Sequence, residues 1–153
     1  MISQKTKYAL KALAVLAHEY HGDGASLRIE EIAQKSETPK RFLEHILLEL
    51  KRAGMIGSKR GREGGYLLIK DPRLIAVSEV LRLVDGPIAP LACLSRRAYK
   101  RCDDCKNEDT CMIRNVFGDL FAGYLLLIES ITLADLMRNP KAADLAVNIR
   151  NQA

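Results

Sequence analysis

Four cysteines lie close together in the second half of a chain of 153 residues. They are Cys93, Cys102, Cys105 and Cys111, in the spacing C-x8-C-x2-C-x5-C. Thiolates this close in sequence can converge on one centre, and soft sulfur ligands suit iron–sulfur clusters and zinc. The spacing therefore predicts a four-cysteine metal site.

The spacing leaves three kinds of chemistry open. Four cysteines can hold an iron–sulfur cluster of the 2Fe-2S or the 4Fe-4S type, which is the hypothesis we favour. They can also hold a structural zinc ion, although the outer spacings are irregular for a zinc ribbon. Without any metal, Cys102 and Cys105 could oxidise to a disulfide and act as a thiol switch.

Cationic side chains accompany the cysteines in the same segment. Neighbouring cations favour the thiolate over the thiol. We therefore expect them to lower the thiol pKa values and to balance the negative charge of a cluster. The residues concerned are Arg96, Arg97, Lys100 and Arg101.

The residue arrangements of common enzymes are missing from the sequence. No Ser-His-Asp or Cys-His arrangement is visible, and the three histidines lie far from the cysteines in sequence. We therefore expect a protein that is not an enzyme, and a thiol redox enzyme is the less favoured alternative. The histidines are His18, His21 and His45.

We expect the protein to be cytoplasmic and to have no membrane partner. Its first apolar stretch is interrupted by Lys5, Lys7 and Lys11, which does not suit a signal peptide. The apolar run 124–128 is too short to cross a bilayer. In a reducing cytosol, clustered cysteines more often bind metals or undergo redox chemistry than form structural disulfides.

Hydrophobic periodicity predicts the elements that must position these residues. Thr38 followed by Pro39 is typical of a helix start, because Thr can cap a helix and Pro fits its first position. The predicted elements are helices at about 3–20, 28–35, 39–53, 77–84 and 111–130, strands at 55–59 and 66–69, and a short terminal helix after Thr132.

This order of elements is that of a winged helix-turn-helix domain, whose third helix enters the major groove of double-stranded DNA. Glu44 on that helix could accept a hydrogen bond from a cytosine amino group. Glycines in the wing turn allow close approach to the duplex, and arginines there favour a narrow minor groove. The candidate DNA-binding residues are Lys40, Arg41, Glu44, His45, Lys59, Arg60 and Arg62.

The distribution of charge also suits DNA. The formal net charge is +5, and residues 1–72 hold 13 basic and 9 acidic residues, against 11 and 10 in residues 73–153. The positive excess therefore lies in the half that carries the predicted winged domain, where it would attract phosphates.

The long helix at 111–130 has a wider apolar stripe than one local core needs. A second copy of the chain would cover the surplus, so we expect a homodimer. The candidate dimerisation residues are Phe117, Leu120, Phe121, Tyr124, Leu127 and Ile128.

The expected fold class is mainly α with a small β-hairpin wing, a winged helix-turn-helix domain plus a long C-terminal dimerisation helix. The expected divisions of the chain are a DNA-binding domain at 1–72, a helix and the cysteine loop at 73–110, the dimerisation helix with a short terminal helix at 111–136, and a flexible tail at 137–153.

Several segments resemble the Rrf family of winged helix-turn-helix transcriptional regulators, which includes IscR-, NsrR- and CymR-like proteins. The Arg-Gly-x-x-Gly-Gly-Tyr wing, which begins at Arg60, is the most specific of the matches. The matching segments are 8–13, 39–44, 50–56 and 60–68.

The resemblance implies a sequence-specific DNA-binding regulator. It would bind a pseudo-palindromic site as a dimer held by the long C-terminal helix. Its DNA contacts would include Arg41, Glu44, Arg52 and Arg60. We expect the cysteine loop to sense redox state, iron–sulfur status or nitric oxide by shifting the spacing of the two recognition helices.

Cluster-binding members of the family carry three cysteines with five residues between neighbours. The last two cysteines here keep that spacing, but the first gap is longer and Cys102 is additional. Some members have a ligand histidine where this chain has Arg114, and others use an aspartate in the region of Lys7 and Tyr8. These departures imply an all-cysteine site with Cys102 as the fourth ligand.

Overall fold

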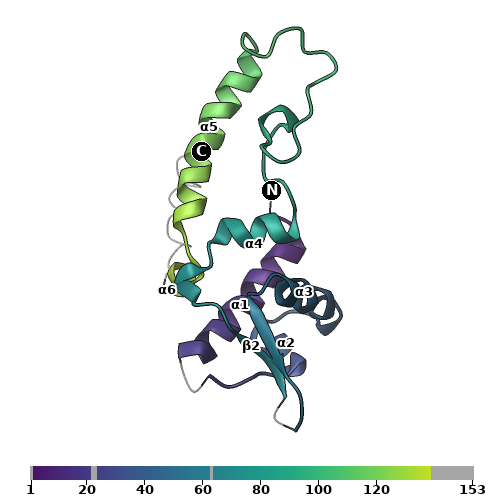
Figure 1. Cartoon of the computed structure of the whole chain (residues 1–153), viewed down its shortest axis with the longest axis vertical. Coiled ribbons are helices and arrows are strands. Elements are labelled where there is room, and N and C mark those ends of the chain that lie inside the picture. Colours follow the sequence, from purple (N-terminus) through teal and green to yellow (C-terminus); the bar gives the residue numbers. More distant parts are fainter. Residues whose placement is uncertain (1, 22–23, 63, 139–153) are drawn as a thin grey trace, which may run out of the picture.

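The computed structural model describes residues 2–21, 24–62 and 64–138. It confirms a mainly helical fold with one two-stranded antiparallel hairpin (Figure 1). In chain order the elements are α1 (Gln4–His21), α2 (Ile29–Lys35), α3 (Lys40–Arg52), β1 (Ile56–Lys59), β2 (Gly65–Leu68), the 3-10 turn η1 (Pro72–Leu74), α4 (Val77–Val84), the 3-10 turn η2 (Ala92–Leu94), α5 (Met112–Ser130) and α6 (Leu133–Arg138).

The core of the winged domain is built around α1. Its buried side chains recur at helical spacing and face the buried stripe of α3, so two amphipathic helices share one apolar interior. The pairing leaves the opposite face of α3 in solvent. The buried residues are Ala9, Ala12, Leu13, Leu16 and Ala17 on α1, and Leu43, Ile46, Leu47 and Leu50 on α3.

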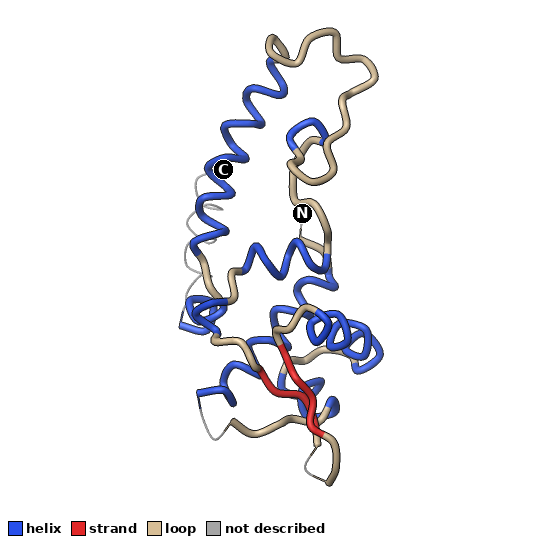
Figure 2. The backbone as a smooth tube through the Cα atoms, viewed as in Figure 1, coloured by secondary structure: helices blue, strands red, loops and turns tan. Residues whose placement is uncertain are grey.

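The wing is fastened to the segment before α2. In the hairpin, red in Figure 2, Ile56 pairs with Leu68 and Lys59 with Gly65. The backbone of Tyr66 also exchanges two hydrogen bonds with Leu27, at 2.8 and 2.7 Å. A Cβ at Gly65 would lie 2.4 Å from the Leu27 carbonyl oxygen, so only glycine allows this approach.

The second half of the chain extends away from the winged domain. Figure 1 shows α5 rising from α6, with the cysteine loop running back on the other side toward α4. Backbone hydrogen bonds from Val77 to Ile131 (2.9 Å) and from Leu133 to Ile75 (2.8 Å) fix the α5–α6 junction to the start of α4. The start of α5 therefore lies far from α2 and α3, whereas its end is anchored to the start of α4.

Most predicted boundaries are within one or two residues of those observed. The predicted capping role of Thr38 is wrong: Pro39 occupies the N-cap of α3, and the Thr38 hydroxyl donates to the Ser36 carbonyl at 3.2 Å. The short terminal helix reaches Arg138, two residues beyond the predicted boundary, and the rest of the tail predicted at 137–153 lies outside the described residues. No helix in the described part of the chain is long and apolar enough to span a bilayer.

Candidate DNA-binding surface and cysteine site

The predicted recognition residues share the solvent-facing side of α3 and the wing. All eight of them are exposed, which follows from the burial of the opposite stripe of α3. Arg52 lies in the last turn of α3, Lys59 ends β1, and Arg60 and Arg62 follow β1 in the chain. The set is Lys40, Arg41, Glu44, His45, Arg52, Lys59, Arg60 and Arg62.

Two cations at the start of α3 differ in how they are held. The guanidinium carbon of Arg41 lies 4.8 Å from the centre of the Phe42 ring, so a cation–π contact orients this side chain. The Lys40 ammonium instead forms an ion pair with Glu30 of α2. This hydrogen-bonded carboxylate raises the pKa of Lys40, and the lysine in turn lowers the pKa of Glu30. Lys40 is thus paired with a carboxylate, whereas Arg41 is oriented by an aromatic ring.

Two cations beside the wing were missed by the sequence analysis. The Arg28 guanidinium donates to the Arg62 carbonyl at 2.7 Å, which ties the start of α2 to the wing turn. The Lys51 ammonium donates to the Ser58 hydroxyl at 2.6 Å, which ties α3 to β1. Lys51 lies in the matching segment 50–56 but was given no role there, and the tertiary pairing of α2 and α3 with the hairpin identifies both cations. Both extend the positive surface next to Arg60 and Lys59.

All four cysteines line one hollow at the start of α5. Its volume is about 410 Å³, and three cysteines come from the loop while Cys111 is the N-cap residue of α5. Cys93 is buried in the turn η2, whereas Cys102 is exposed. The fold thus brings together all four cysteines that the sequence predicted as ligands, although eight residues separate Cys93 from Cys102.

The thiols affect one another's pKa values across this hollow. Desolvation, and then the neighbouring and hydrogen-bonded Cys93, raise the pKa of Cys102. Desolvation and Cys111, which hydrogen-bonds with Cys105, likewise raise the pKa of Cys105, although Arg101 opposes this. The expected lowering of thiol pKa by the loop cations is therefore wrong for these two cysteines, because burial and thiol neighbours outweigh them.

The donor set fits an iron–sulfur cluster better than a single ion. Among the described residues, no three Cys, His, Asp or Glu side chains converge closely enough to hold one metal ion. Four cysteines on one hollow instead supply the number and type of ligands that an iron–sulfur cluster takes. The residues present therefore fit such a cluster, with Cys93, Cys102, Cys105 and Cys111 as its ligands.

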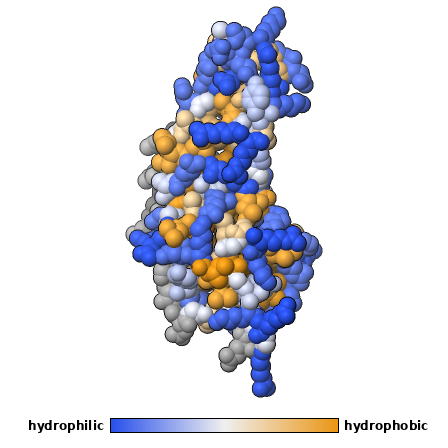
Figure 3. Space-filling model, in the orientation of Figure 1, coloured by the Kyte–Doolittle hydropathy of each residue, from blue (hydrophilic) through white to orange (hydrophobic). Residues whose placement is uncertain are grey.

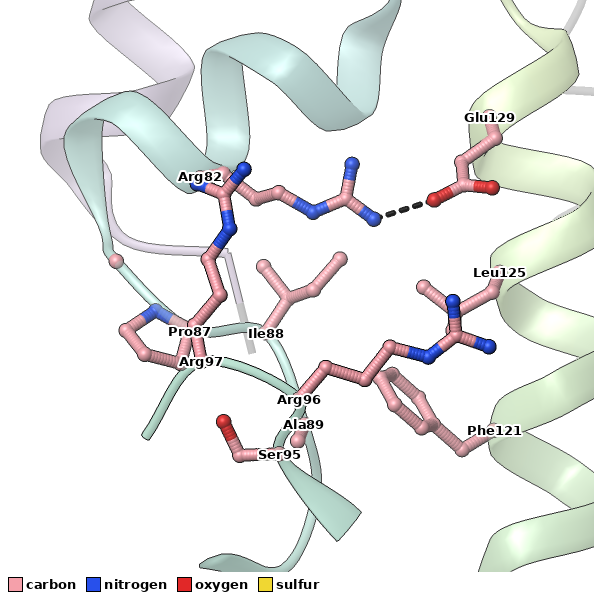
Figure 4. A pocket seen from close by; sticks show the side chains of 11 residues that line it. Arg82, Pro87, Ile88, Ala89, Ser95, Arg96, Arg97, Phe121, Leu125 and Glu129 are labelled. Carbon is pink, nitrogen blue, oxygen red and sulfur yellow. Dashed lines mark hydrogen bonds and ion pairs between the residues drawn. The ribbon is translucent and has the colours of Figure 1, made fainter. Parts of the chain in front are cut away.

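A second cavity, of about 600 Å³, separates the beginning of the cysteine loop from α5. Figure 4 shows Ile88, Phe121 and Leu125 on its walls, and Arg82 of α4 reaching across to an ion pair with Glu129 of α5. This pair connects the helix before the cysteine loop directly to the helix after it.

The exposed side of α5 is apolar along most of its length. Large hydrophobic side chains recur every three or four residues, and Figure 3 shows apolar surface gathered over the middle of the molecule. The exposed apolar stripe consists of Ile113, Val116, Phe117, Leu120, Tyr124 and Leu127.

Two predicted dimerisation residues, Phe121 and Ile128, do not belong to that stripe. Phe121 is half-buried and lines the cavity between the cysteine loop and α5 in its own chain. Ile128 is only 7% exposed, because it packs against Val77 and Leu81 of α4 in its own chain. Within the described part of α5, it alone is buried. Its helical periodicity was the same as that of its neighbours, so the sequence could not separate a contact inside the chain from one between chains.

Comparisons with known proteins agree with this arrangement. The family model Rrf2, described as an iron-dependent transcriptional regulator, matches residues 2–139. An rrf2-like HTH-type transcriptional regulator of Rhodobacter capsulatus is 59% identical over 93% of this chain and 97% of its own. The regulator IscR of Yersinia enterocolitica is 28% identical over 95% of this chain and 84% of its own.

A solved structure has the same fold. CymR, described as the global cysteine regulator of B. subtilis, superposes with a TM-score of 0.73 over 92% of this chain and 98% of its own, at 28% identity. Each of these proteins is named for regulation, and none for an enzymatic activity.

Proposed function

The chain belongs to the Rrf2 family of DNA-binding transcriptional regulators, and on that premise we propose that it is a homodimeric, cytoplasmic sensor whose four cysteines hold an iron–sulfur cluster. Occupation of the cysteine site sets its affinity for operator DNA. The observation that carries the proposal is the convergence of all four cysteines on one hollow.

Sequence-specific reading is assigned to the exposed face of α3. An α-helix in the major groove reads base edges with a few side chains, while cations around it contact phosphates. Glu44 and Arg41 stand on that face and suit base contacts, whereas Lys59, Arg60 and Arg62 suit the backbone or the minor groove. The Arg28 contact holds the wing in position for this role.

The convergence of four thiols on one hollow supports an iron–sulfur cluster over the alternatives. A structural zinc ion would need four ligands around one point, and the described residues offer no such convergence. A metal-free switch remains the second candidate. Cys93 is the thiol that most affects the pKa of Cys102, and Cys111 the thiol that most affects that of Cys105, so we expect the disulfides of such a switch to join these neighbours.

A second copy of the chain is the proposed cover for the exposed apolar stripe of α5. Full burial of one large aliphatic side chain stabilises an interface by roughly 1.5–3 kcal/mol. The stripe runs along a helix whose end packs against α4 and whose start meets the cysteine loop. Two such helices packed together would place one winged domain on each half of a pseudo-palindromic site.

A route from the cysteine site to the DNA-binding helices is available through α4. The cysteine loop follows directly after α4, whose last residues contact α1 through Asp85 and Ser3. The ion pair between Arg82 and Glu129 joins the same helix to α5. A bound cluster that orders the loop would therefore favour one placement of α4 relative to α1 and α5.

The composition of protein purified without oxygen tests the cofactor. We expect a coloured protein with matching contents of iron and sulfide, and loss of both in Cys102→Ala. A colourless protein with one zinc per chain would mean that the cysteine site is a structural zinc site and not a sensor. A metal-free protein that responds to oxidants would favour the thiol switch.

A further inference from the structure

The side chain of Arg114 has a buried donor with no acceptor. Its Nε atom is shielded from solvent and has no hydrogen-bond partner among the residues that the structure describes. The same side chain lines the hollow formed by the four cysteines. A buried N–H without an acceptor destabilises a fold, so its presence on the wall of this hollow requires an explanation.

The position of Arg114 on α5 directs it toward the cysteine site. It lies three residues after Cys111, on the same side of the first turn of α5. Its backbone N–H donates to the Cys111 sulfur at 3.5 Å. Side chains on a helix tilt toward its N-terminus, which here is the end that faces the cysteine loop.

Neighbouring polar groups do not supply the missing acceptor. The Glu108 carboxylate accepts from the Tyr99 hydroxyl at 2.8 and 2.9 Å. The other arginine of the site, Arg101, donates to the carbonyl oxygens of Cys105 and Lys106, both at 2.8 Å. Asp104 also lines the hollow, but it is exposed, whereas the Arg114 Nε is shielded from solvent. Asn107 also lines the hollow, but its side-chain oxygen accepts from the Asp109 N–H at 2.9 Å. The Thr110 hydroxyl and the sulfur atoms of the four cysteines are the remaining side-chain acceptors on this wall.

We propose that Arg114 is a positioning residue that donates its Nε–H to a sulfur atom of the bound cluster and so raises the cluster's reduction potential. This rests on the proposed cluster site. Arginine carries no lone pair and stays protonated, so it donates to sulfur but cannot ligate iron in place of a histidine. A hydrogen bond to sulfur, together with a positive charge, stabilises the more negative, reduced state.

The test compares the midpoint potentials of three variants with that of the native protein. Arg114→Met removes both the charge and the donor, whereas Arg114→Lys keeps the charge. Arg101→Met is the matched control, because it removes a nearby charge whose donor groups bind backbone carbonyls. Iron content and melting temperature identify variants that load the cluster and fold normally.

We expect Arg114→Met to lower the reduced-to-oxidised ratio at a fixed potential by about tenfold, which for a one-electron couple corresponds to 59 mV. Arg114→Lys should fall between this variant and the native protein, and Arg101→Met should change the ratio less than Arg114→Met. A shift in Arg114→Met no larger than that in Arg101→Met would overturn the inference. If Arg114→Met does not retain its cluster, Arg114→Lys takes its place. A shift in midpoint potential in Arg114→Lys no larger than that in Arg101→Met would then overturn the inference.

A spectroscopic readout separates a hydrogen bond from a purely structural role. Exchange into D2O should shift the iron–sulfur stretching bands in resonance Raman spectra of the native protein, and this shift should shrink in Arg114→Met. If the chain takes up no iron, the cobalt(II)-loaded protein serves instead. A move of its sulfur-to-cobalt absorption band in Arg114→Met would support the role of Arg114 while rejecting the cluster, and an unchanged band would reject both.

Discussion

Glu44 and Arg60 are exposed residues of opposite charge on the proposed DNA-binding surface. Arg60→Ala should weaken binding to all DNA by about 1–3 kcal/mol, because it removes a cation from the duplex. Glu44→Ala should weaken operator binding but strengthen non-specific binding, since it removes both a base contact and a repulsive charge. Fluorescence anisotropy with operator and random duplexes measures both effects.

Lys100→Ala is the control for this pair of variants, because it removes an exposed charge from the cysteine loop rather than the wing. It should leave both affinities nearly unchanged. Operator affinity that is unaffected by Glu44→Ala and Arg60→Ala would mean that α3 and the wing do not form the reading surface.

The arrangement of the thiols makes a prediction about the metal-free protein. Oxidation of the cluster-free chain by a disulfide reagent should join Cys93 to Cys102 and Cys105 to Cys111, with two electrons from each pair passing to the reagent. Peptide mapping by mass spectrometry identifies the partners. A predominant disulfide between Cys102 and Cys105 would contradict the observed arrangement.

At the level of single residues, the sequence identified the chemistry but not the pairing. The clustering of cysteines and the outward positions on α3 are local properties that spacing reveals. The partnership of Cys93 with Cys102 depends on how the turn η2 packs, and the orphan Nε of Arg114 depends on the shape of the hollow. Neither property has a sequence pattern.

Helices and strands followed from periodicity because each buries one face against a neighbour. The start of α3 was placed one residue early, since Thr38 uses its hydroxyl on Ser36 instead of capping. The apolar stripe of α5 was predicted as a whole, but Ile128 belongs to the core with α4. A stripe shared between two surfaces cannot be divided from sequence alone.

The link between α1 and α4 makes a pH-dependent contribution to stability. Desolvation opposes ionisation of Asp85, but hydrogen bonds from Ser3 and Thr6 outweigh it, so the pKa of Asp85 is lowered. The stabilisation is therefore present above the ordinary Asp pKa and is lost as pH falls through the lower, folded value. Asp85→Asn should reduce the free energy of unfolding at pH 7 by about 1 kcal/mol or less, because the carboxylate is exposed.

Urea titrations at neutral pH and below about pH 4 measure this effect. The difference in free energy of unfolding between the native protein and Asp85→Asn should narrow at the lower pH. Asp104→Asn changes an exposed carboxylate of the cysteine loop, and its difference from the native protein should not depend on pH in this way. An equal difference for Asp85→Asn at both pH values would show that ionisation of Asp85 does not hold α1 to α4.

The apolar stripe of α5 offers a matched pair of substitutions for the dimer. Leu127 lies on the stripe and is 68% exposed, while Leu126 is 74% exposed but lies on another side of the helix. Leu127→Glu should raise the dimer dissociation constant by about tenfold or more, because burial of a leucine contributes roughly 1.5–3 kcal/mol. Leu126→Glu should leave it nearly unchanged. Sedimentation of both variants measures this, and equal effects would place the interface elsewhere.

The proposed roles of DNA reading and of sensing are assigned to opposite ends of the molecule. The DNA-facing helices and wing lie at one end, and the cysteine site and the start of α5 at the other (Figure 1). α4 connects the two, through Asp85 to α1 and through Arg82 to α5. The sequence predicted both parts, but the connection depends on side-chain contacts between elements distant in the chain.

Operator affinity in the loaded and the cluster-free states tests the central claim most directly. The operator is first isolated by selecting genomic fragments that the loaded protein retains. We expect the two affinities to differ by at least about tenfold, a coupling of about 1.4 kcal/mol, and Cys105→Ala to bind with the cluster-free affinity under all redox conditions. Equal affinities of the two states, with full cluster occupancy verified, would contradict a sensing role for the cysteine site.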